Sequence, residues 1–213
     1  MAFVATASGH IFGILALILL LAWLIHFRGG IDLNSSDAAH IFNVHPFLMY
    51  FGFVFFAGEA IMAYKTVRVD WKAQKFVHMS LHVIAIVLGI VGIYAAFKYH
   101  KQQGIANMYS LHSWLGLGTF IIYGLQWIFG FFYFWVQGAD ASARRSYAIW
   151  HIFFGRVLLY MAICTAESGL MQSSTLLGLG AGTESRIVNF AGLAILLFGI
   201  SADLAIAPIP DAF

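Results

Sequence analysis

The sequence predicts an all-α integral membrane protein with six transmembrane helices, because of its composition and its six long apolar stretches. Of its 213 residues, 62% are hydrophobic and only 9% are charged, whereas soluble domains average about 25% charged residues. So few charges could not cover the surface of a soluble protein of this size. Six spans of about 20 residues use about 120 positions, which leaves room only for short loops. We therefore expect residues 1–213 to form a single transmembrane domain.

The expected helices follow one another along the chain with short connections. They cover residues 8–27, 46–64, 76–97, 113–136, 147–165 and 187–207. The first has no basic residue before it and no cleavage site after it, so we expect a retained helix rather than a signal peptide. The second begins at Pro46, a residue type that is tolerated at the first position of a helix. The other four are separated by short charged loops and by the Gly-rich connector 177–183, which lacks the Lys-Ser/Thr pair of a phosphate loop.

The basic residues of the loops predict the orientation of the chain. The side that holds both termini carries six Lys and Arg residues and the opposite side carries four, so the positive-inside rule places both termini in the cytoplasm. The overall balance of 11 Lys+Arg to 9 Asp+Glu is too even for a nucleic-acid-binding protein. The lone Cys164 excludes an internal disulfide framework and the Cys-x-x-Cys-His attachment of c-type haem.

Four of the nine histidines are expected at two matched depths. His45 and His112 open helices on the non-cytoplasmic side, and His78 and His151 open helices on the cytoplasmic side. With a span of about 30 Å, the two levels lie about 20 Å apart. Ionisable groups at membrane depth are costly and rarely lack a role, so two facing pairs of imidazoles suggest the axial ligands of two b-type haems. A non-haem di-metal site would need carboxylates such as Glu-x-x-His, and no Glu here has a His three positions on.

Glycines follow these histidines on the same helix faces. Gly116, Gly155, Gly52 and Gly89 come four, four, seven and eleven residues after His112, His151, His45 and His78, respectively. Because such spacings return to one face at 3.6 residues per turn, we expect these glycines to leave room for the porphyrins.

Other polar residues near these levels have more than one interpretation. His82 lies one turn beyond His78 and could replace it as a ligand, bind a metal together with it, or hydrogen-bond a haem edge. Glu59 lies near the cytoplasmic level, and we expect it either to form an ion pair with Arg156 or to tune protons and redox potential.

The first helix carries features of its own. Gly9-x-x-x-Gly13 could mark the face of a homodimer or could pack inside the bundle. His10 and His26 lie near the two ends of this helix without a partner at their level, so we expect them to be interfacial anchors.

Short motifs surround the four matched histidines and Glu59. They are Asn43-Val44-His45-Pro46, Gly58-Glu59-Ala60, Lys75-Phe76-Val77-His78, Tyr109-Ser110-Leu111-His112-Ser113-Trp114 and Trp150-His151-Ile152-Phe153-Phe154-Gly155. These motifs resemble the cytochrome b561 family of transmembrane ascorbate-dependent oxidoreductases. The resemblance covers essentially the whole chain, with plant-like loops.

The resemblance implies a central four-helix bundle that holds two haems b, with His45 and His112 binding one and His78 and His151 the other. It implies one-electron transfer from cytoplasmic ascorbate, through both haems, to monodehydroascorbate or a ferric chelate on the other side. The sequence leaves the acceptor open. The plant-like members of the family imply a vacuolar membrane or another endomembrane. A protein of another class, which conducts protons or transports a solute by a His/Glu relay, is the alternative that the residues themselves leave.

Three cations precede the cytoplasmic histidines and could bind the ascorbate anion. Lys72 and Lys75 come six and three residues before His78, and Arg144 comes seven before His151. Such cations could bind ascorbate or the haem propionates, or could serve only as loop charges that set topology. The family places substrate contacts at the positions of Lys75 and Arg144.

On the other side, three residues near the helix of His112 match the acceptor site of the family. They are Tyr99, His100 and Asn107. His100 could donate a hydrogen bond or a proton to the acceptor, or could be an ordinary histidine of an exposed loop.

Overall fold

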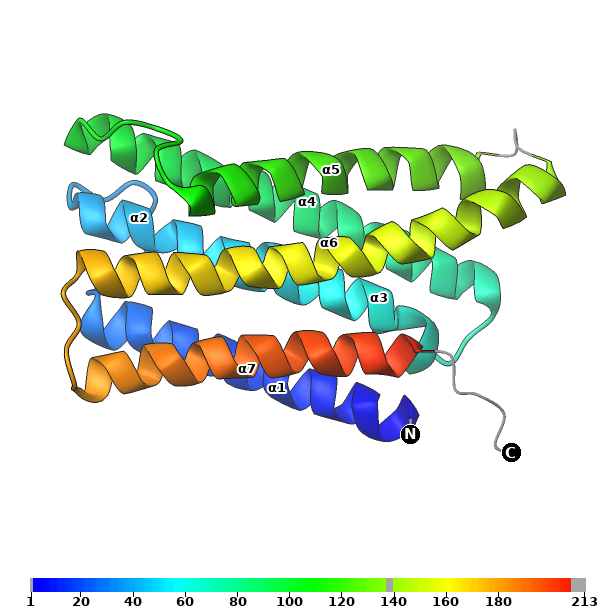
Figure 1. Cartoon of the computed structure of the whole chain (residues 1–213), viewed down its shortest axis with the longest axis horizontal. Coiled ribbons are helices and arrows are strands. Elements are labelled where there is room, and N and C mark those ends of the chain that lie inside the picture. The colour runs from blue at the N-terminus through cyan, green and yellow to red at the C-terminus, as the bar shows by residue number, and fades with distance from the viewer. Residues whose placement is uncertain (1, 137–139, 208–213) are drawn as a thin grey trace.

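The structure is a computed structural model that describes residues 2–136 and 140–207, and its regular elements are all helices (Figure 1). In chain order they are α1 (Ala2–Ala22), the π-helical segment η1 (Trp23–Phe27), α2 (Ala38–Phe47), the π-helical segment η2 (Leu48–Phe55), α3 (Phe56–Thr66), α4 (Trp71–Gln103), α5 (Leu111–Phe134), α6 (Ala141–Leu176) and α7 (Thr183–Ile206). α1 continues into η1, and α2, η2 and α3 form one continuous helix. Six helices in the described residues are therefore long and apolar enough to cross a membrane, which confirms the predicted all-α architecture.

Capping side chains fix the starts of four helices. Asp37, Asp70, Ser110 and Asp140 each accept a hydrogen bond from a backbone N–H in the first turn of α2, α4, α5 and α6, respectively. A cap of this kind satisfies an N–H group that has no partner within the helix. α4 and α6 consequently begin five and six residues before their apolar stretches, at Trp71 and Ala141.

The predicted position of Pro46 at the start of the second transmembrane helix is wrong. The helix starts at Ala38, and Pro46 lies inside it rather than at its first position. Proline has no N–H to donate and its ring crowds the preceding turn. The backbone changes to π-helical geometry directly afterwards, from Leu48 to Phe55. His45 therefore lies two turns inside its helix.

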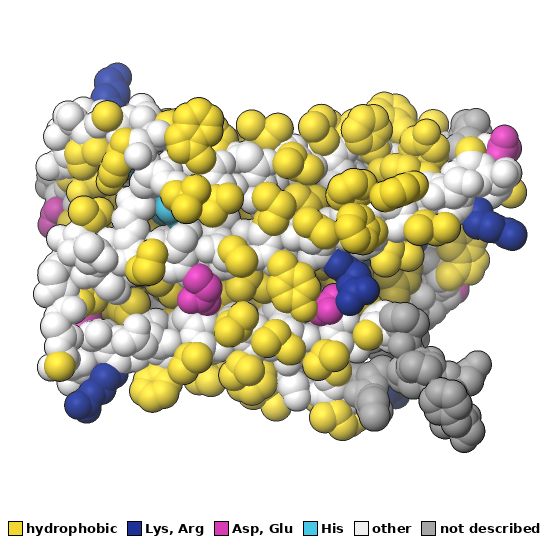
Figure 2. Space-filling view, viewed as in Figure 1, with side chains coloured by type: hydrophobic (Ala, Val, Ile, Leu, Met, Phe, Trp, Pro, Cys, Tyr) yellow, Lys and Arg dark blue, Asp and Glu magenta, His cyan; other side chains and the backbone are white. Residues whose placement is uncertain are grey.

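The helices are arranged as a central bundle with two helices at its side. α2 and α3 pack along α4, α5 packs along α6, and α1 packs along α7 (Figure 1). The start of α1, the end of α7, the connection α3–α4, the end of α5 and the start of α6 lie at one end of the bundle (Figure 1). Figure 2 shows hydrophobic side chains over the middle of one face and Lys and Arg side chains mainly towards its ends, as expected for a lipid-facing surface.

The two glycines of the first helix pack inside the protein. A methyl group at Gly9 would lie 2.9 Å from the sulfur of Met62, and one at Gly13 would lie 2.7 Å from the ring of Phe55 and 3.0 Å from that of Phe198. Gly9 and Gly13 therefore let α1 approach α3 and α7 closely. Of the two interpretations of this motif, the structure favours packing within the bundle.

Candidate functional site

The four matched histidines form two facing pairs. The ring centroids of His45 (α2) and His112 (α5) lie 6.0 Å apart, and those of His78 (α4) and His151 (α6) lie 6.3 Å apart. Metal–imidazole bonds are about 2.0–2.1 Å long and the ring centre lies about 1.1 Å beyond the nitrogen, so two rings on one metal have centres about 6 Å apart. Both pairs fit an ion held between them.

Three of the four imidazoles are oriented by a backbone carbonyl of another helix. Their Nδ1–H groups donate to Gly92 from His45 (3.0 Å), to Ala60 from His78 (2.8 Å) and to Thr165 from His112 (3.0 Å). A ring whose Nδ1–H is used in this way presents the lone pair of Nε2 to a metal.

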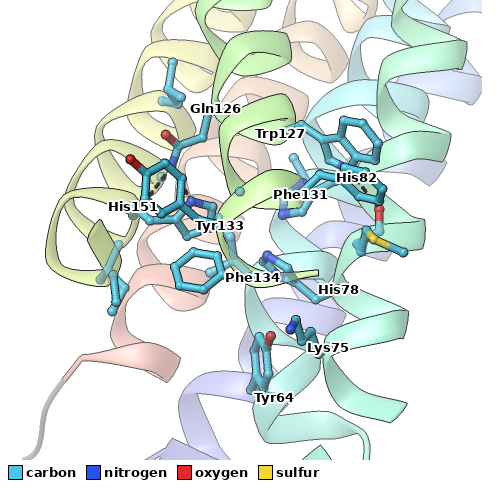
Figure 3. Close-up of a pocket in the computed structure, with 18 of the residues that line it drawn as sticks. Tyr64, Lys75, His78, His82, Gln126, Trp127, Phe131, Tyr133, Phe134 and His151 are labelled. Carbon is cyan, nitrogen blue, oxygen red and sulfur yellow. Dashed lines mark hydrogen bonds between the residues drawn. The ribbon is translucent and has the colours of Figure 1, made fainter. Parts of the chain in front are cut away.

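His151 is held by a side chain instead. The amide Nε2 of Gln126 lies 3.1 Å from Nδ1 of His151 and donates to its backbone oxygen at 2.7 Å. Figure 3 shows His78 and His82 on one side of the cavity and His151 with Gln126 on the other. Gln126 is not among the predicted site residues, although a single amide within an apolar stretch is a usable signal of a functional residue.

The donor set distinguishes a haem iron from a bare metal ion. Within residues 2–136 and 140–207, no group of three or more His, Cys, Asp or Glu side chains could hold a metal ion. Two imidazoles and no carboxylate suit an iron whose four remaining bonds come from a porphyrin. The residues present therefore fit haem b.

A cavity of about 1340 Å³ surrounds His78 and His151 (Figure 3). It exceeds the usual ligand pocket of about 300–1,000 Å³. It extends from Lys72 and Arg144 at its mouth to Phe53 and Ala162 in the middle of the bundle. Most of its lining is aromatic or aliphatic, as a macrocycle with a polar edge requires.

The glycines that contact the histidines are not those expected. A methyl group at Gly130 would lie 2.9 Å from Cε1 of His151, and one at Gly169 would lie 2.7 Å from Cε1 of His112. Each glycine belongs to the helix facing its histidine, so the spacing along one helix could not reveal it.

Of the glycines predicted to leave room for a porphyrin, one lies beside the cavity and others lie against side chains of neighbouring helices. Gly155 lines the cavity, whereas a methyl group at Gly52 or Gly89 would collide with Leu88 or Phe120, respectively. The predicted role of Gly52 and Gly89 as space for a porphyrin is therefore wrong, because side chains of the neighbouring helices fill that space.

His82 contacts His78, and it is His78 whose ring faces that of His151. Its Nδ1 shares a 2.5 Å hydrogen bond with the hydroxyl of Tyr123, and its ring lies edge-on to that of His78 at 4.4 Å. This arrangement favours His78 as the partner of His151.

The three predicted cations lie at the mouth of the cavity. Lys72, Lys75 and Arg144 all line it, and no Asp or Glu is among its described lining residues. The Nζ atom of Lys75 lies 5.7 Å from the ring centre of Trp71 and 5.6 Å from that of Trp135. The mouth is therefore positively charged and aromatic.

At the opposite end, the three residues of the predicted acceptor site lie next to one another. Nδ1–H of His100 donates to Oδ1 of Asn107 at 3.0 Å. The ring of Tyr99 lies 5.9 Å from that of His100 and 4.9 Å from that of Phe42. Phe42 in turn lies 6.0 Å from the ring of His45. Tyr99 and Phe42 thus form an aromatic connection from the α4–α5 region to the histidine.

The expected pair of Glu59 with Arg156 is wrong. Oε1 of Glu59 lies 2.9 Å from Nδ1 of His10, so His10 is not simply an interfacial anchor. Arg156 donates through Nε and Nη2 to both carboxylate oxygens of Asp203, at 2.5 and 2.9 Å. Bidentate geometry of this kind is the strongest that Arg and a carboxylate form, and Asp203 was the missed acid of the last helix.

Comparisons with known proteins find related proteins over most of the chain. Residues 44–177 match the family described as eukaryotic cytochrome b561. The chain is 45% identical over 210 residues to ascorbate-specific transmembrane electron transporter 1 of Zea mays, covering 96% of this chain and 89% of that protein. It is 39% identical over 195 residues to transmembrane ascorbate ferrireductase 2 of Arabidopsis thaliana (89% and 85% covered) and 40% identical over 185 residues to a transmembrane ascorbate-dependent reductase of Mus musculus (84% and 72%).

Proposed function

The chain belongs to the eukaryotic cytochrome b561 family, and we propose that it transfers single electrons across the membrane from ascorbate, through two b-type haems, to an acceptor on the far side. The proposal rests on the two pairs of facing histidines. The ring centroids lie 6.0 Å apart in one pair and 6.3 Å apart in the other. Relatives named for ascorbate-dependent electron transport or reduction support the same activity. The protein is an ascorbate-dependent oxidoreductase of the membrane.

In this proposal His45 and His112 hold one haem, and His78 and His151 hold the other. Haem b supplies an iron that alternates between its ferric and ferrous states. The protein supplies fixed ligands, since the carbonyls of Gly92 and Ala60 and the amide of Gln126 orient the rings. Ligands that are held in place need little rearrangement when the charge on the iron changes.

Ascorbate docks at the mouth of the cavity, next to the cytoplasmic pair. Ascorbate is an anion, and Lys72, Lys75 and Arg144 gather positive charge there without a lining carboxylate. The positive-inside rule places this end of the bundle, with both termini, in the cytoplasm.

On the far side, His100 and Asn107 receive the acceptor, with Tyr99 and Phe42 leading to His45. The acceptor is monodehydroascorbate or a ferric chelate. The name of the Arabidopsis thaliana relative, a ferrireductase, supports the second. The membrane is the vacuolar membrane or another endomembrane, as for the plant-like members of the family.

The test of the proposal is the haem content of the purified protein. We expect two b-type haems per chain, both reducible by ascorbate, and we expect His112→Ala and His151→Ala to remove one haem each. Retention of both haems by either variant would refute the ligand assignment. A protein without haem would refute electron transfer and favour a His/Glu proton relay, for which the His10–Glu59 pair would be the candidate.

The acceptor is tested with the protein in sealed vesicles that contain either a ferric chelate or ascorbate with ascorbate oxidase, which generates the short-lived monodehydroascorbate radical inside. Ascorbate is added at the side of the termini, and loss of the trapped acceptor is measured. Reduction by the wild-type protein but not by His112→Ala would support transfer through both haems. Equal reduction by both proteins would refute it.

A further inference from the structure

Lys75 lies near two tryptophans at the mouth of the cavity. Trp71 opens α4, Lys75 follows it by one turn on the same face, and Trp135 comes directly after α5. The ammonium group lies 5.7 Å from one indole centre and 5.6 Å from the other. A cation within about 6 Å of an indole face is attracted by the ring. The charge of Lys75 thus lies within reach of both indole rings.

Both indoles remain accessible next to the lysine. The exposed fractions of Trp71 and Trp135 are 63% and 41%. Both also line the cavity, together with Arg144. A ligand that reaches Lys75 therefore meets flat aromatic surfaces next to the charge.

The inner part of the mouth is aromatic as well. Phe134 lines the cavity, with its ring 5.3 Å from that of His151. Tyr133 also lines it and is stacked on Tyr147, with centroids 4.2 Å apart and planes at 22°. Charge alone would attract any anion, whereas aromatic faces distinguish a planar ligand from a flexible one, because stacking needs a flat partner.

We propose that Trp71 and Trp135 determine the specificity of this site by selecting planar cyclic monoanions over open-chain anions of equal charge. The inference rests on the proposed docking of ascorbate and deepens it. Lys75 supplies the attraction for the negative charge, and the two indoles supply the surface on which the flat enediol-lactone ring lies. The tryptophans are specificity residues that contact the substrate and take no part in electron transfer.

The test uses the haem-loaded protein and two inhibitors of equal charge. Tetronate is a planar lactone monoanion, and gluconate is an open-chain monoanion. The KM for ascorbate and the inhibition constants of tetronate and gluconate are measured for the wild type, Trp71→Leu, Trp135→Leu and the double variant. Trp150→Leu is the matched control, because Trp150 is 58% exposed and is not among the described lining residues. The haem spectrum reports whether each variant is folded.

We expect each single variant to raise the KM for ascorbate and the inhibition constant of tetronate about threefold. The double variant should raise both about tenfold. The gluconate constant and kcat stay unchanged, and Trp135→Phe keeps most of the wild-type selectivity. An equal rise in the inhibition constants of tetronate and gluconate would overturn the inference, because the indoles would then act only by positioning Lys75. Unchanged constants for all ligands would overturn it as well.

The variant Lys75→Met separates a failure of the specificity proposal from a failure of the proposed docking site. If ascorbate reduces the wild-type haems and Lys75→Met raises the constants of both inhibitors, the docking site is supported whatever the tryptophan variants do. If Lys75→Met changes none of the constants, the docking site lies elsewhere, and both the site and the specificity proposal are refuted.

Discussion

Gly130 and Gly169 show how closely each imidazole lies against the helix that faces it. Gly130 is in α5 and Gly169 in α6, and neither position leaves space for a methyl group beside His151 or His112. Because these contacts cross between helices, they depend on how the helices pack, and the histidine depths alone could not predict them. The depths did predict which histidines face each other, since antiparallel helices of known length fix the level of each residue.

We expect Gly130→Ala to weaken haem binding at the His78–His151 pair and to leave the other haem in place. The added methyl group would lie 2.9 Å from the ring of His151 and would displace it. Gly118→Ala and Gly124→Ala are controls in the same helix, where an added methyl group meets nothing within 4 Å. These controls should gain about 0.5–1 kcal/mol in stability, because alanine loses less backbone entropy than glycine. The haem-to-protein ratio measures the outcome, and equal haem content in all three variants would contradict it.

The partners of the charged residues inside the membrane could not be predicted from spacing along the sequence. Glu59 and Arg156 lie at similar depths, yet their partners are His10 and Asp203, which come from the two helices at the side of the bundle. Depth selects the level of a partner but not the helix that carries it. The sequence did show that each of these charges would need a partner.

We expect Asp203→Asn to lower the free energy of unfolding by about 2 kcal/mol, below the usual cost for a fully buried pair because the Arg156 side chain is 39% exposed. The variant leaves the guanidinium without its bidentate carboxylate. At this chain length such a loss lowers Tm by about 4–8 °C. Thermal unfolding in detergent measures it, with Glu59→Gln for comparison. The double change Arg156→Met with Asp203→Leu should recover most of the loss, and a wild-type Tm for Asp203→Asn would contradict the prediction.

At the scale of the helices, apolar stretches located the parts within the membrane but not the ends. α2, α4 and α6 begin at Ala38, Trp71 and Ala141, each directly after a capping aspartate. Hydropathy reports the hydrocarbon core of the bilayer, whereas a helix begins where its first N–H groups find acceptors. The capping residues were visible in the sequence. The π-helical geometry after Pro46 was not, because its form depends on packing against the neighbouring helices.

The cap of α4 provides a test that joins helix formation to substrate binding. Asp70 accepts hydrogen bonds from the N–H groups of Lys72 and Ala73 and so fixes the turn that carries Trp71. Asp70→Ala should cost about 1 kcal/mol of stability and raise the KM for ascorbate. Asp70→Asn keeps the cap and removes a negative charge near the mouth, so its KM should equal that of the wild type or fall. A higher KM for both variants would show that the carboxylate itself, rather than the cap, matters.

At the scale of the whole molecule, the long helices separate two kinds of environment. α4 has 33 residues and α6 has 36, so they are about 50 Å long and extend beyond a hydrocarbon core of about 30 Å. Their histidines lie within the apolar region, and their first turns carry the cations at the mouth of the cavity. Each of these helices therefore places cations at a fixed distance from a buried histidine. The sequence predicted this order of cations and histidines, but the aromatic residues between them became visible only in the folded chain.

This arrangement predicts that ionic strength affects ascorbate binding but not electron transfer within the protein. The cations act at the solvent boundary, where added salt shortens the screening length to about 8 Å at physiological ionic strength, whereas the histidine pairs lie in a medium that salt does not enter. We expect the KM for ascorbate to rise several-fold between low and physiological ionic strength while kcat stays constant. In the double variant Lys75→Met with Arg144→Met, the KM should be high at both ionic strengths and nearly independent of salt, because the screened charges have been removed. An uncharged reductant is the control for general effects of salt on the protein, and its rate should not change. If the double variant shows the same salt dependence as the wild type, the attraction of the anion arises elsewhere on the surface and the mouth of the cavity is not its route of entry.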